Sequence, residues 1–183
     1  MLNVILDGFP DEYEGYLIRT DFRIGIQISE ALSDVNLADP EKMITALRLL
    51  YGAGIPANLK LAEEGLAWFM RGGQPISDSA PSGKPPTFDF EQDNRYVYSA
   101  FRARYGIDLT RERLHWFAFI AMLDDLGGCS LSDIMGIRGA DLSKLSGEQL
   151  RRYTELQAKY RVKQQMSDSD LAMIAEFEEK LKG

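Results

Sequence analysis

The segment IDLTRERLHWFAFIAMLDDLGG, residues 107–128, carries an unusual amount of apolar surface and largely decides the fold. Thr110 is a suitable N-cap for a helix, and Gly127 is a suitable stop. Apolar residues cover two sides of this helix: Leu114, Phe117, Ala118, Ala121 and Leu126 on one, and Trp116, Phe119, Ile120 and Leu123 on the other. A helix that is apolar on most of its circumference lies at the centre of a domain or is shared with a partner.

Helical spacing of apolar residues predicts further helices upstream of this segment. Residues 20–34 fit a helix capped by Thr20 or Asp21, although three isoleucines also alternate there as they would in a strand. Residues 38–52 predict a helix with Asp39 as its N-cap. Residues 56–73 predict another with Asn58 in that role.

Residues 88–106 predict a long helix that ends at Gly106, with Val97, Ala100 and Phe101 facing inward. The break before the next helix is short, so we expect the two to pack as a helical hairpin. Residues 130–145 predict a short helix and polar turns. Two further helices are predicted over 146–165, where Ser146 and Gln149 form a capping-box pattern, and over 167–183.

The N-terminus predicts a small β-hairpin. Residues 4–6 and 16–20 are short apolar runs of strand length, joined by a connection that contains Asp11, Glu12 and Glu14. The predicted fold class is therefore mainly α, a helical protein with a small N-terminal β-hairpin. The predicted organisation is an N-terminal part (1–71), a Gly-, Pro- and Ser-rich flexible linker (72–86) and a C-terminal helical part (87–183), with one core shared between the two parts as an open alternative.

The 183-residue chain is 45% hydrophobic and 27% charged, which is ordinary for a soluble globular protein. Its single cysteine excludes an intramolecular disulfide and a multi-cysteine zinc site. We see no signal peptide at the N-terminus, and no apolar run approaches the ~20 residues that span a bilayer. These features predict a cytoplasmic protein.

The formal net charge of −7 and the pI of about 4.8 argue against nucleic acid as a partner, because nucleic-acid backbones are polyanions. One segment opposes this trend, since it places several basic residues near two tyrosines: Arg151, Arg152, Lys159, Arg161 and Lys163, with Tyr153 and Tyr160. A basic and aromatic surface can bind nucleic acid. We favour a solvated helix face that pairs with acidic neighbours.

Neither the histidine nor the cysteine predicts catalysis. His115 would need an orienting carboxylate, and Asp124 and Asp125 lie ~14 Å away along the predicted helix. We predict a packed histidine with a backbone partner, and an unreactive Cys129. The acidic clusters at 89–93 and 124–125 are better explained as helix-end residues than as metal ligands. We therefore predict no catalytic, cofactor-binding or metal-binding residues and no enzyme activity.

The ordered motifs of the C-terminal half resemble a known family. YGIDLTRERLHWFAFIAMLDDL, followed by LSDIMGIRGADLSKLSGEQ, resembles the bacteriophage family called gene product fifteen. Members carry a Tyr-Gly-Ile-Asp-Leu segment, a Leu-His-Trp helix and an Ile-Met-x-x-Arg-x-x-Asp-Leu-Ser-Lys turn, here at 105–109, 114–116 and 134–144. Upstream, TDFR at 20–23 and WFMRGG at 68–73 are also similar. The likeness extends to about Tyr160, and residues 167–183 match nothing in it.

The resemblance implies a tail protein of a long-tailed phage or prophage, acting in the cytoplasm of the bacterial host. Such proteins are thought to be tail-assembly chaperones, which hold the long, apolar tape-measure protein soluble until tail tube subunits wrap it. The family has no known catalytic residues. The tape-measure protein is the expected partner, and the tail tube protein and further copies of the chain are additional candidates; no membrane is expected.

Four aromatic residues are the predicted partner-binding candidates. We predict that Trp68, Phe69, Trp116 and Phe119 either form the core or line a groove for the tape-measure protein, in the manner of a helix bound in a groove. Two alternatives stay open. One is a structural tail component that forms a homo-oligomeric ring, and the other is a nucleic-acid-associated phage factor that uses residues 151–163.

Overall fold

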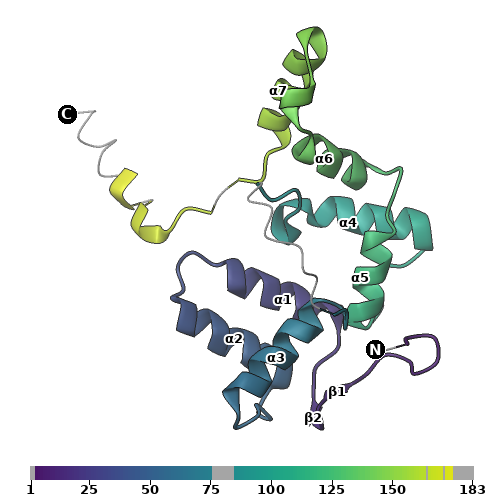
Figure 1. Cartoon of the computed structure of the whole chain (residues 1–183), viewed down its shortest axis with the longest axis vertical. Helices are drawn as coiled ribbons and strands as arrows, with labels where there is room; N and C mark the ends of the chain where they lie inside the picture. The colour runs from purple at the N-terminus through teal and green to yellow at the C-terminus, as the bar shows by residue number, and fades with distance from the viewer. Residues whose placement is uncertain (1–2, 76–84, 164, 171, 175–183) are drawn as a thin grey trace.

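The computed structural model describes residues 3–75, 85–163, 165–170 and 172–174. Its elements, in chain order, are β1 (Glu12–Tyr13), β2 (Tyr16–Leu17), α1 (Phe22–Ser33), α2 (Asp39–Tyr51), α3 (Leu59–Met70), α4 (Phe90–Tyr105), α5 (Trp116–Asp124), α6 (Ser130–Gly139), the 3-10 helix η1 (Leu142–Lys144) and α7 (Gly147–Tyr160). Figure 1 shows α2, α3 and the hairpin at one end of the molecule and α6 and α7 at the other. The predicted fold class is confirmed.

The N-terminal hairpin is present, and its second strand lies within the predicted run 16–20, but its first strand is not the predicted one. β1 and β2 pair antiparallel across a two-residue turn, in which Glu14 and Gly15 have φ angles of 50° and 81°. Positive φ angles at both positions match the twist of a tight hairpin. The prediction of a strand at residues 4–6 is wrong, because the carbonyl of Asn3 accepts hydrogen bonds from two later amides and folds this stretch into turns. The first strand lies inside the predicted acidic connection.

Helix α1 resolves the ambiguity between helix and strand in favour of a helix. Its N-cap is Asp21, whose side chain accepts a hydrogen bond from the amide of Arg23 at 3.0 Å. Gly25 and Ile28 are buried on one face of this helix. A Cβ atom at Gly25 would lie 2.2 Å from the ring of Trp116, so the absence of a side chain lets α1 and α5 approach closely.

Several predicted helix ends are confirmed. Asn58 caps α3 by accepting a hydrogen bond from the amide of Leu61 at 3.3 Å. Gly106 ends α4 in the left-handed conformation, with φ 73°, which glycine adopts without steric cost.

Two caps differ from prediction. Helix α2 includes Asp39 and is capped at Ala38, whose amide donates to the Glu41 side chain at 2.9 Å. Ser146 is the N-cap residue of α7, but its side chain makes no cap hydrogen bond, so the predicted capping box is absent.

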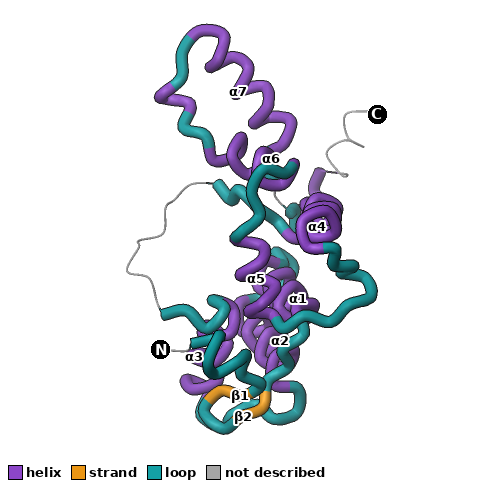
Figure 2. The backbone as a smooth tube through the Cα atoms, turned by 90° about the vertical axis from the view of Figure 1, so that its right-hand side faces the viewer, coloured by secondary structure: helices purple, strands orange, loops and turns teal. Residues whose placement is uncertain are grey.

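Helix α5 starts at Trp116, well after the predicted cap at Thr110. The amide of Trp116 donates to the carbonyl of Thr20 at 2.7 Å, and the amide of Phe22 donates to the carbonyl of Leu114 at 2.9 Å. These bonds hold the segment before α5 in an extended conformation beside the start of α1. Figures 1 and 2 show α5 lying beside α1, which is its main packing partner, whereas α4 packs mainly on α6. The expected helical hairpin of α4 and α5 is therefore not the main contact of either helix.

One hydrophobic core draws on both sides of the predicted linker. The Phe119 ring stacks on Phe22 at 4.8 Å and on Phe101 at 5.0 Å between centroids. Residues 1–71 and 87–183 thus contribute to the same cluster of buried side chains. The greater part of the predicted linker, residues 76–84, lies outside the described residues, as do residues 171 and 175–183 of the predicted C-terminal helix.

Helices α6 and α7 form an arm that extends from the core, and Figure 2 shows α7 at its far end. Helix α6 buries Leu131 and Ile134, whereas α7 contains no fully buried residue. Beyond α7, Lys163 pairs with Gln92 of α4, and the amide of Asp168 donates to the side chain of Asn36 at 2.8 Å. No helix among the described residues has the length and apolar character needed to cross a membrane.

Candidate functional site

The four predicted partner-binding residues lie in or against the core. Phe69, Trp116 and Phe119 are at most 1% exposed. Trp68 is half-buried and packs edge-on against Phe117, with 5.1 Å between ring centroids. A partner could reach the three buried rings only if the core opened. In this conformation they therefore form part of the core and do not line a groove.

The single histidine has a structural role at the start of α5. Its Nδ1 accepts a hydrogen bond from the amide of Phe117 at 3.0 Å, and its Nε2 lies 3.0 Å from the carbonyl oxygen of Pro10. Both contacts are satisfied when Nε2 carries the proton and Nδ1 does not. His115 is therefore the N-cap of α5 and holds the N-terminal segment, which confirms the predicted backbone partner. The Phe9 ring stacks on it at 4.9 Å.

Protonation of His115 should destabilise the protein. Burial lowers the pKa of His115 from its ordinary value, and the hydrogen bond to Pro10 and the charge of Asp11 only partly oppose this shift. The unfolded chain then binds a proton more readily than the folded one, so stability is complete above the ordinary histidine pKa, ~6.5, and falls as the pH drops toward the lowered folded value. A proton on Nδ1 would also face the amide of Phe117 and the positive end of the α5 dipole.

We expect the melting temperature of the protein to decrease as the pH falls from 7.5 through ~6.5, in a window above most carboxyl titrations. His115→Asn keeps a cap acceptor and should flatten this dependence, whereas His115→Ala should cost ~1 kcal/mol near pH 7.5 and less as the pH falls, because the wild type loses stability there and alanine does not titrate. Scanning calorimetry across the window tests both variants. An Asn variant that shows the same pH slope as the wild type would rule out His115 as the source.

The remaining predicted groups are separate from one another. Cys129 is half-buried at the start of α6, where its amide donates to the hydroxyl of Ser132 at 3.1 Å. Asp125 is exposed and lies 3.7 Å from Arg104 in an ion pair. In the described ranges, no three His, Cys, Asp or Glu side chains converge in a way that could hold a metal ion.

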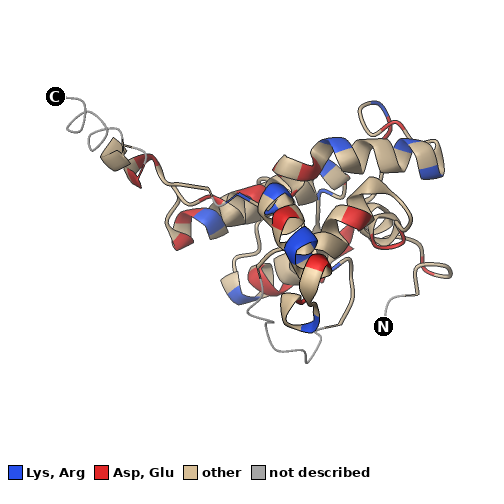
Figure 3. Ribbon diagram, turned by 90° about the horizontal axis from the view of Figure 1, so that it is seen from above, with Lys and Arg blue, Asp and Glu red and all other residues tan. Residues whose placement is uncertain are grey.

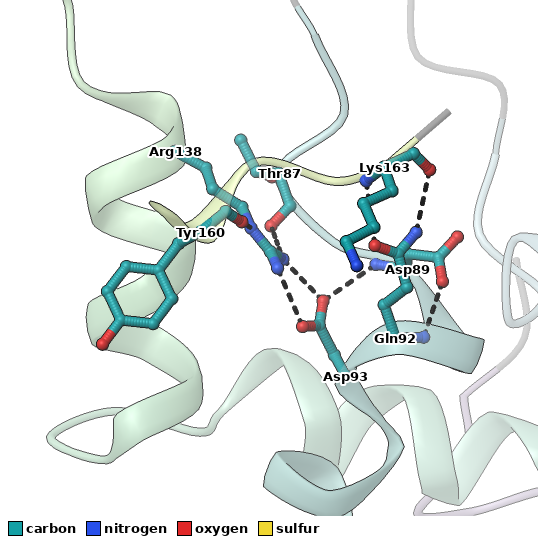
Figure 4. A network of polar contacts seen from close by, with 7 residues as sticks. All are labelled: Thr87, Asp89, Gln92, Asp93, Arg138, Tyr160 and Lys163. Atoms are coloured by element: carbon teal, nitrogen blue, oxygen red, sulfur yellow. Dashed lines mark hydrogen bonds and ion pairs between the residues drawn. The ribbon is translucent and has the colours of Figure 1, made fainter. Parts of the chain in front are cut away.

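The cluster at 89–93 contains a feature that sequence reasoning missed. Asp93 is fully buried and forms a two-bonded ion pair with Arg138 of α6, at 2.6 and 3.0 Å. Figure 4 shows that the same guanidinium group also donates to the backbone carbonyls of Thr87 and Tyr160. One arginine thus joins the beginning of α4, the body of α6 and the end of α7.

A sequence signal for this pair does exist. Asp93 lies four residues before the buried Val97, and Arg138 lies four residues after the buried Ile134. Each charged residue therefore sits on the apolar stripe of its helix, and buried charges in such positions are usually paired. The macrodipole argument for the acidic cluster is sound for Asp89, whose side chain caps α4, but is incomplete for Asp93.

The arm formed by α6 and α7 is held together by polar contacts as well. The Gln157 side chain donates to the carbonyls of Ile137 and Ala140, both at 2.9 Å. These carbonyls lie at the C-terminus of α6, where the usual helical partners run out; that of Ile137 also accepts a hydrogen bond from the amide of Ala140 at 3.3 Å. Gln157 thereby fixes the end of one helix against the middle of the next.

A groove of about 630 Å³ opens between the two helices of this arm. We call it the α6–α7 groove, and its lining consists of Ser132, Asp133, Gly136, Ile137, Ala140, Gln149, Arg152, Tyr153 and Leu156. Ile137, Tyr153 and Leu156 are half-buried apolar side chains, while Asp133, Gln149 and Arg152 are exposed polar ones. Apolar walls with a polar rim are typical of a groove that receives an amphipathic helix.

Gly136 leaves part of this groove open. A Cβ atom there would have no other heavy atom within 4 Å, and the residue lies inside α6 with an ordinary helical backbone. A glycine in the interior of a helix costs ~1 kcal/mol relative to alanine. Its position therefore enlarges the groove at the expense of helix stability.

A family model described as Bacteriophage Gp15 protein matches residues 7–162. The chain belongs to this family. No curated protein and no solved structure matches it significantly. Membership in the Gp15 family indicates a structural or assembly protein of a bacteriophage.

The motifs that carried the resemblance to the Gp15 family meet in space. Arg23 of the TDFR motif donates to the carbonyl of Leu109 at 2.7 Å and to that of Glu112 at 3.1 Å, between the two motifs at 105–109 and 114–116. The arginine of the third motif is Arg138, which holds the arm on α4. These motif residues serve the fold of the Gp15 chain, and none of the contacts described for them assembles a reactive group.

Proposed function

We propose that this Gp15-family protein is a tail-assembly chaperone that binds an amphipathic helical segment of the tape-measure protein in the α6–α7 groove. The observation that carries the proposal is the half-exposed apolar lining of this groove on an arm that buries little else. Family membership supports a role in phage assembly. A chaperone of this kind needs a surface for extended apolar helices and needs no catalytic group.

The proposed complex relies on a shallow, open site. Leu156 and Tyr153 supply apolar contact from α7, and Ile137 supplies it from α6. The rim offers one acidic and one basic side chain, Asp133 and Arg152, which suit the polar edges of a client helix. Burial of each apolar client residue contributes ~1.5–3 kcal/mol at most, so several must dock together for stable binding.

Gly136→Leu should abolish client binding without loss of stability, because leucine favours the helix and its side chain fills the groove. The matched control is Ala158→Leu, an exposed position on α7 that does not line the groove. Each variant would be co-expressed with fragments of the tape-measure protein from the same phage, and retention would be measured by pull-down at low salt. We expect wild type and the control to retain a fragment and Gly136→Leu to retain at least tenfold less.

Two results would contradict the proposed function. One is that wild type retains no tape-measure fragment at low salt. The other is that Gly136→Leu retains as much as Ala158→Leu does, which would place any binding surface outside the groove. Thermal melts of the three proteins show that loss of binding does not reflect unfolding; we expect the melting temperature of Gly136→Leu to equal or exceed that of wild type.

A further inference from the structure

A second groove runs between α1 and the beginning of α4, away from the arm. It consists of cavities of about 820 and 430 Å³, joined by a small one that shares lining residues with both. Four carboxylates line this α1–α4 groove: Glu30, Asp34, Asp89 and Glu91. Its apolar surface includes Val35, Leu49 and Phe88. The site is therefore both acidic and apolar.

The four carboxylates have no cationic partner within the described ranges. None of them forms an ion pair with any residue that the structure describes. Burial, together with the like charges of Glu91 and Asp89, raises the pKa of Glu30 from its ordinary value. A positive charge placed among them would relieve this repulsion. Figure 3 shows acidic and basic residues interspersed along the helices.

A segment of the chain already crosses this groove. Lys163, Gln165 and Met166 contribute to its lining, and we call residues 163 and 165–168 the strap. Gln92 holds the strap through two hydrogen bonds to the main chain of Lys163, at 2.8 and 3.0 Å. The Gln165 side chain donates to Glu91 at 3.2 Å.

The strap is weakly attached and lies outside the family match, which ends at residue 162. It is held by a few hydrogen bonds to the exposed side chains of Gln92, Glu91 and Asn36, each worth little where water competes. Met166 remains 44% exposed, so the strap buries little apolar surface. It nevertheless brings one lysine and one apolar side chain to the groove. A positive charge and an apolar side chain complement a surface that is both acidic and apolar.

We propose that the α1–α4 groove is a docking site for a basic, amphipathic polypeptide segment of a partner protein, and that the strap is a displaceable stand-in for that segment. The strap brings one lysine to a groove lined by four carboxylates, and that lysine shares a cavity only with Asp89. A ligand with several lysines or arginines on one side and apolar residues on the other therefore complements the groove better than the strap does. The site is separate from the α6–α7 groove and does not depend on the chaperone proposal.

A labelled helical peptide with leucines on one side and lysines on the other is the probe, and the same peptide with glutamate in place of lysine is its counterpart. We expect the lysine peptide to bind the full chain, more weakly at high salt, and the glutamate peptide not to bind. Glu30→Gln combined with Glu91→Gln should weaken binding roughly fivefold. The control Glu63→Gln with Asp124→Asn removes the same charge outside the groove and should leave binding unchanged. Fluorescence anisotropy measures all of these.

The strap is tested with Gln92→Ala, which removes both bonds to Lys163 and should tighten peptide binding several-fold. Three outcomes would overturn the proposal: no binding of the lysine peptide, equal binding of the two peptides, or equal weakening by groove and control variants. Concentration-dependent self-association that the groove variants abolish would also overturn it, because the occupant would then be a second copy of the chain. Gly136→Leu should leave peptide binding intact, which separates this test from that of the proposed function.

Discussion

Asp93→Ala is expected to reduce the free energy of unfolding by about 3–5 kcal/mol, because it leaves the buried guanidinium of Arg138 without its counter-charge. The Asp93 side chain is fully buried and that of Arg138 is 7% exposed, so water cannot replace the lost partner. The same guanidinium joins α4, α6 and α7, and its release should also loosen the arm. We expect faster amide exchange in α6 and α7 than in α1 and α2.

Chemical denaturation of wild type and variant measures this cost. The matched control is Glu155→Ala, which breaks the exposed Arg151–Glu155 pair on α7 and should cost no more than ~0.5 kcal/mol. Replacing both partners, by Asp93→Leu with Arg138→Met, should recover much of the loss, since apolar pairs of similar volume often substitute for buried ion pairs. A cost below ~1 kcal/mol for Asp93→Ala would show that the pair is not buried in solution.

Trp116→Ala is expected to cost about 3–5 kcal/mol, the usual range for removing a large aromatic side chain from a core. Trp116 is 1% exposed and its ring lies 5.7 Å from Phe119 and 6.0 Å from Phe69. Its indole nitrogen is buried without a hydrogen-bond partner among the described residues. Trp116→Phe, which removes that unpaired group and keeps an aromatic ring, should therefore cost clearly less.

The coupling between Trp116 and Gly25 gives this prediction a specific control. Gly25→Ala alone should destabilise the protein by about 1–3 kcal/mol or more, because the new methyl group would overlap the indole ring. In the Trp116→Ala background the same change should become neutral or stabilising, since alanine favours a helix. A double-mutant cycle with simply additive costs would show that α1 and α5 do not touch at this point.

Local signals made much of the helical framework predictable. Asp21, Asn58 and Asp89 cap helices with their own side chains, and Gly106 ends one in the left-handed conformation. These effects act within a few residues, so a single sequence contains them. The apolar spacing of 88–106 likewise identified Val97, Ala100 and Phe101 as inward-facing, and all three are buried.

The errors occurred where distant contacts override local preference. Thr110 is a good cap by composition, but bonds from residues 20–22 keep the chain extended up to His115, and a histidine caps α5 instead. The pairing of Asp93 with Arg138 joins residues 45 positions apart, which no local pattern specifies. The hairpin error differs in that its cause is local: the two-residue turn at Glu14 and Gly15 determines the register.

The candidate site was the least predictable part. The aromatic content of the sequence indicated Trp116 and Phe119, but both are buried in the core. The groove instead uses Ile137, Tyr153 and Leu156, whose apolar stripe on α7 is short and interrupted by charged residues. Sequence periodicity reports which face of a helix is apolar, but it does not report whether another element covers that face.

The shared core has a consequence for biosynthesis. Phe22 and Phe69 leave the ribosome well before α5, in which Phe119 stacks on Phe22 and Trp116 stacks on Phe69. At ~5–20 residues per second, the roughly fifty positions from Phe69 to Phe119 take several seconds to translate. During that interval the nascent α1–α3 surface has no cover, so folding of this phage protein must be completed late, after α5 has emerged.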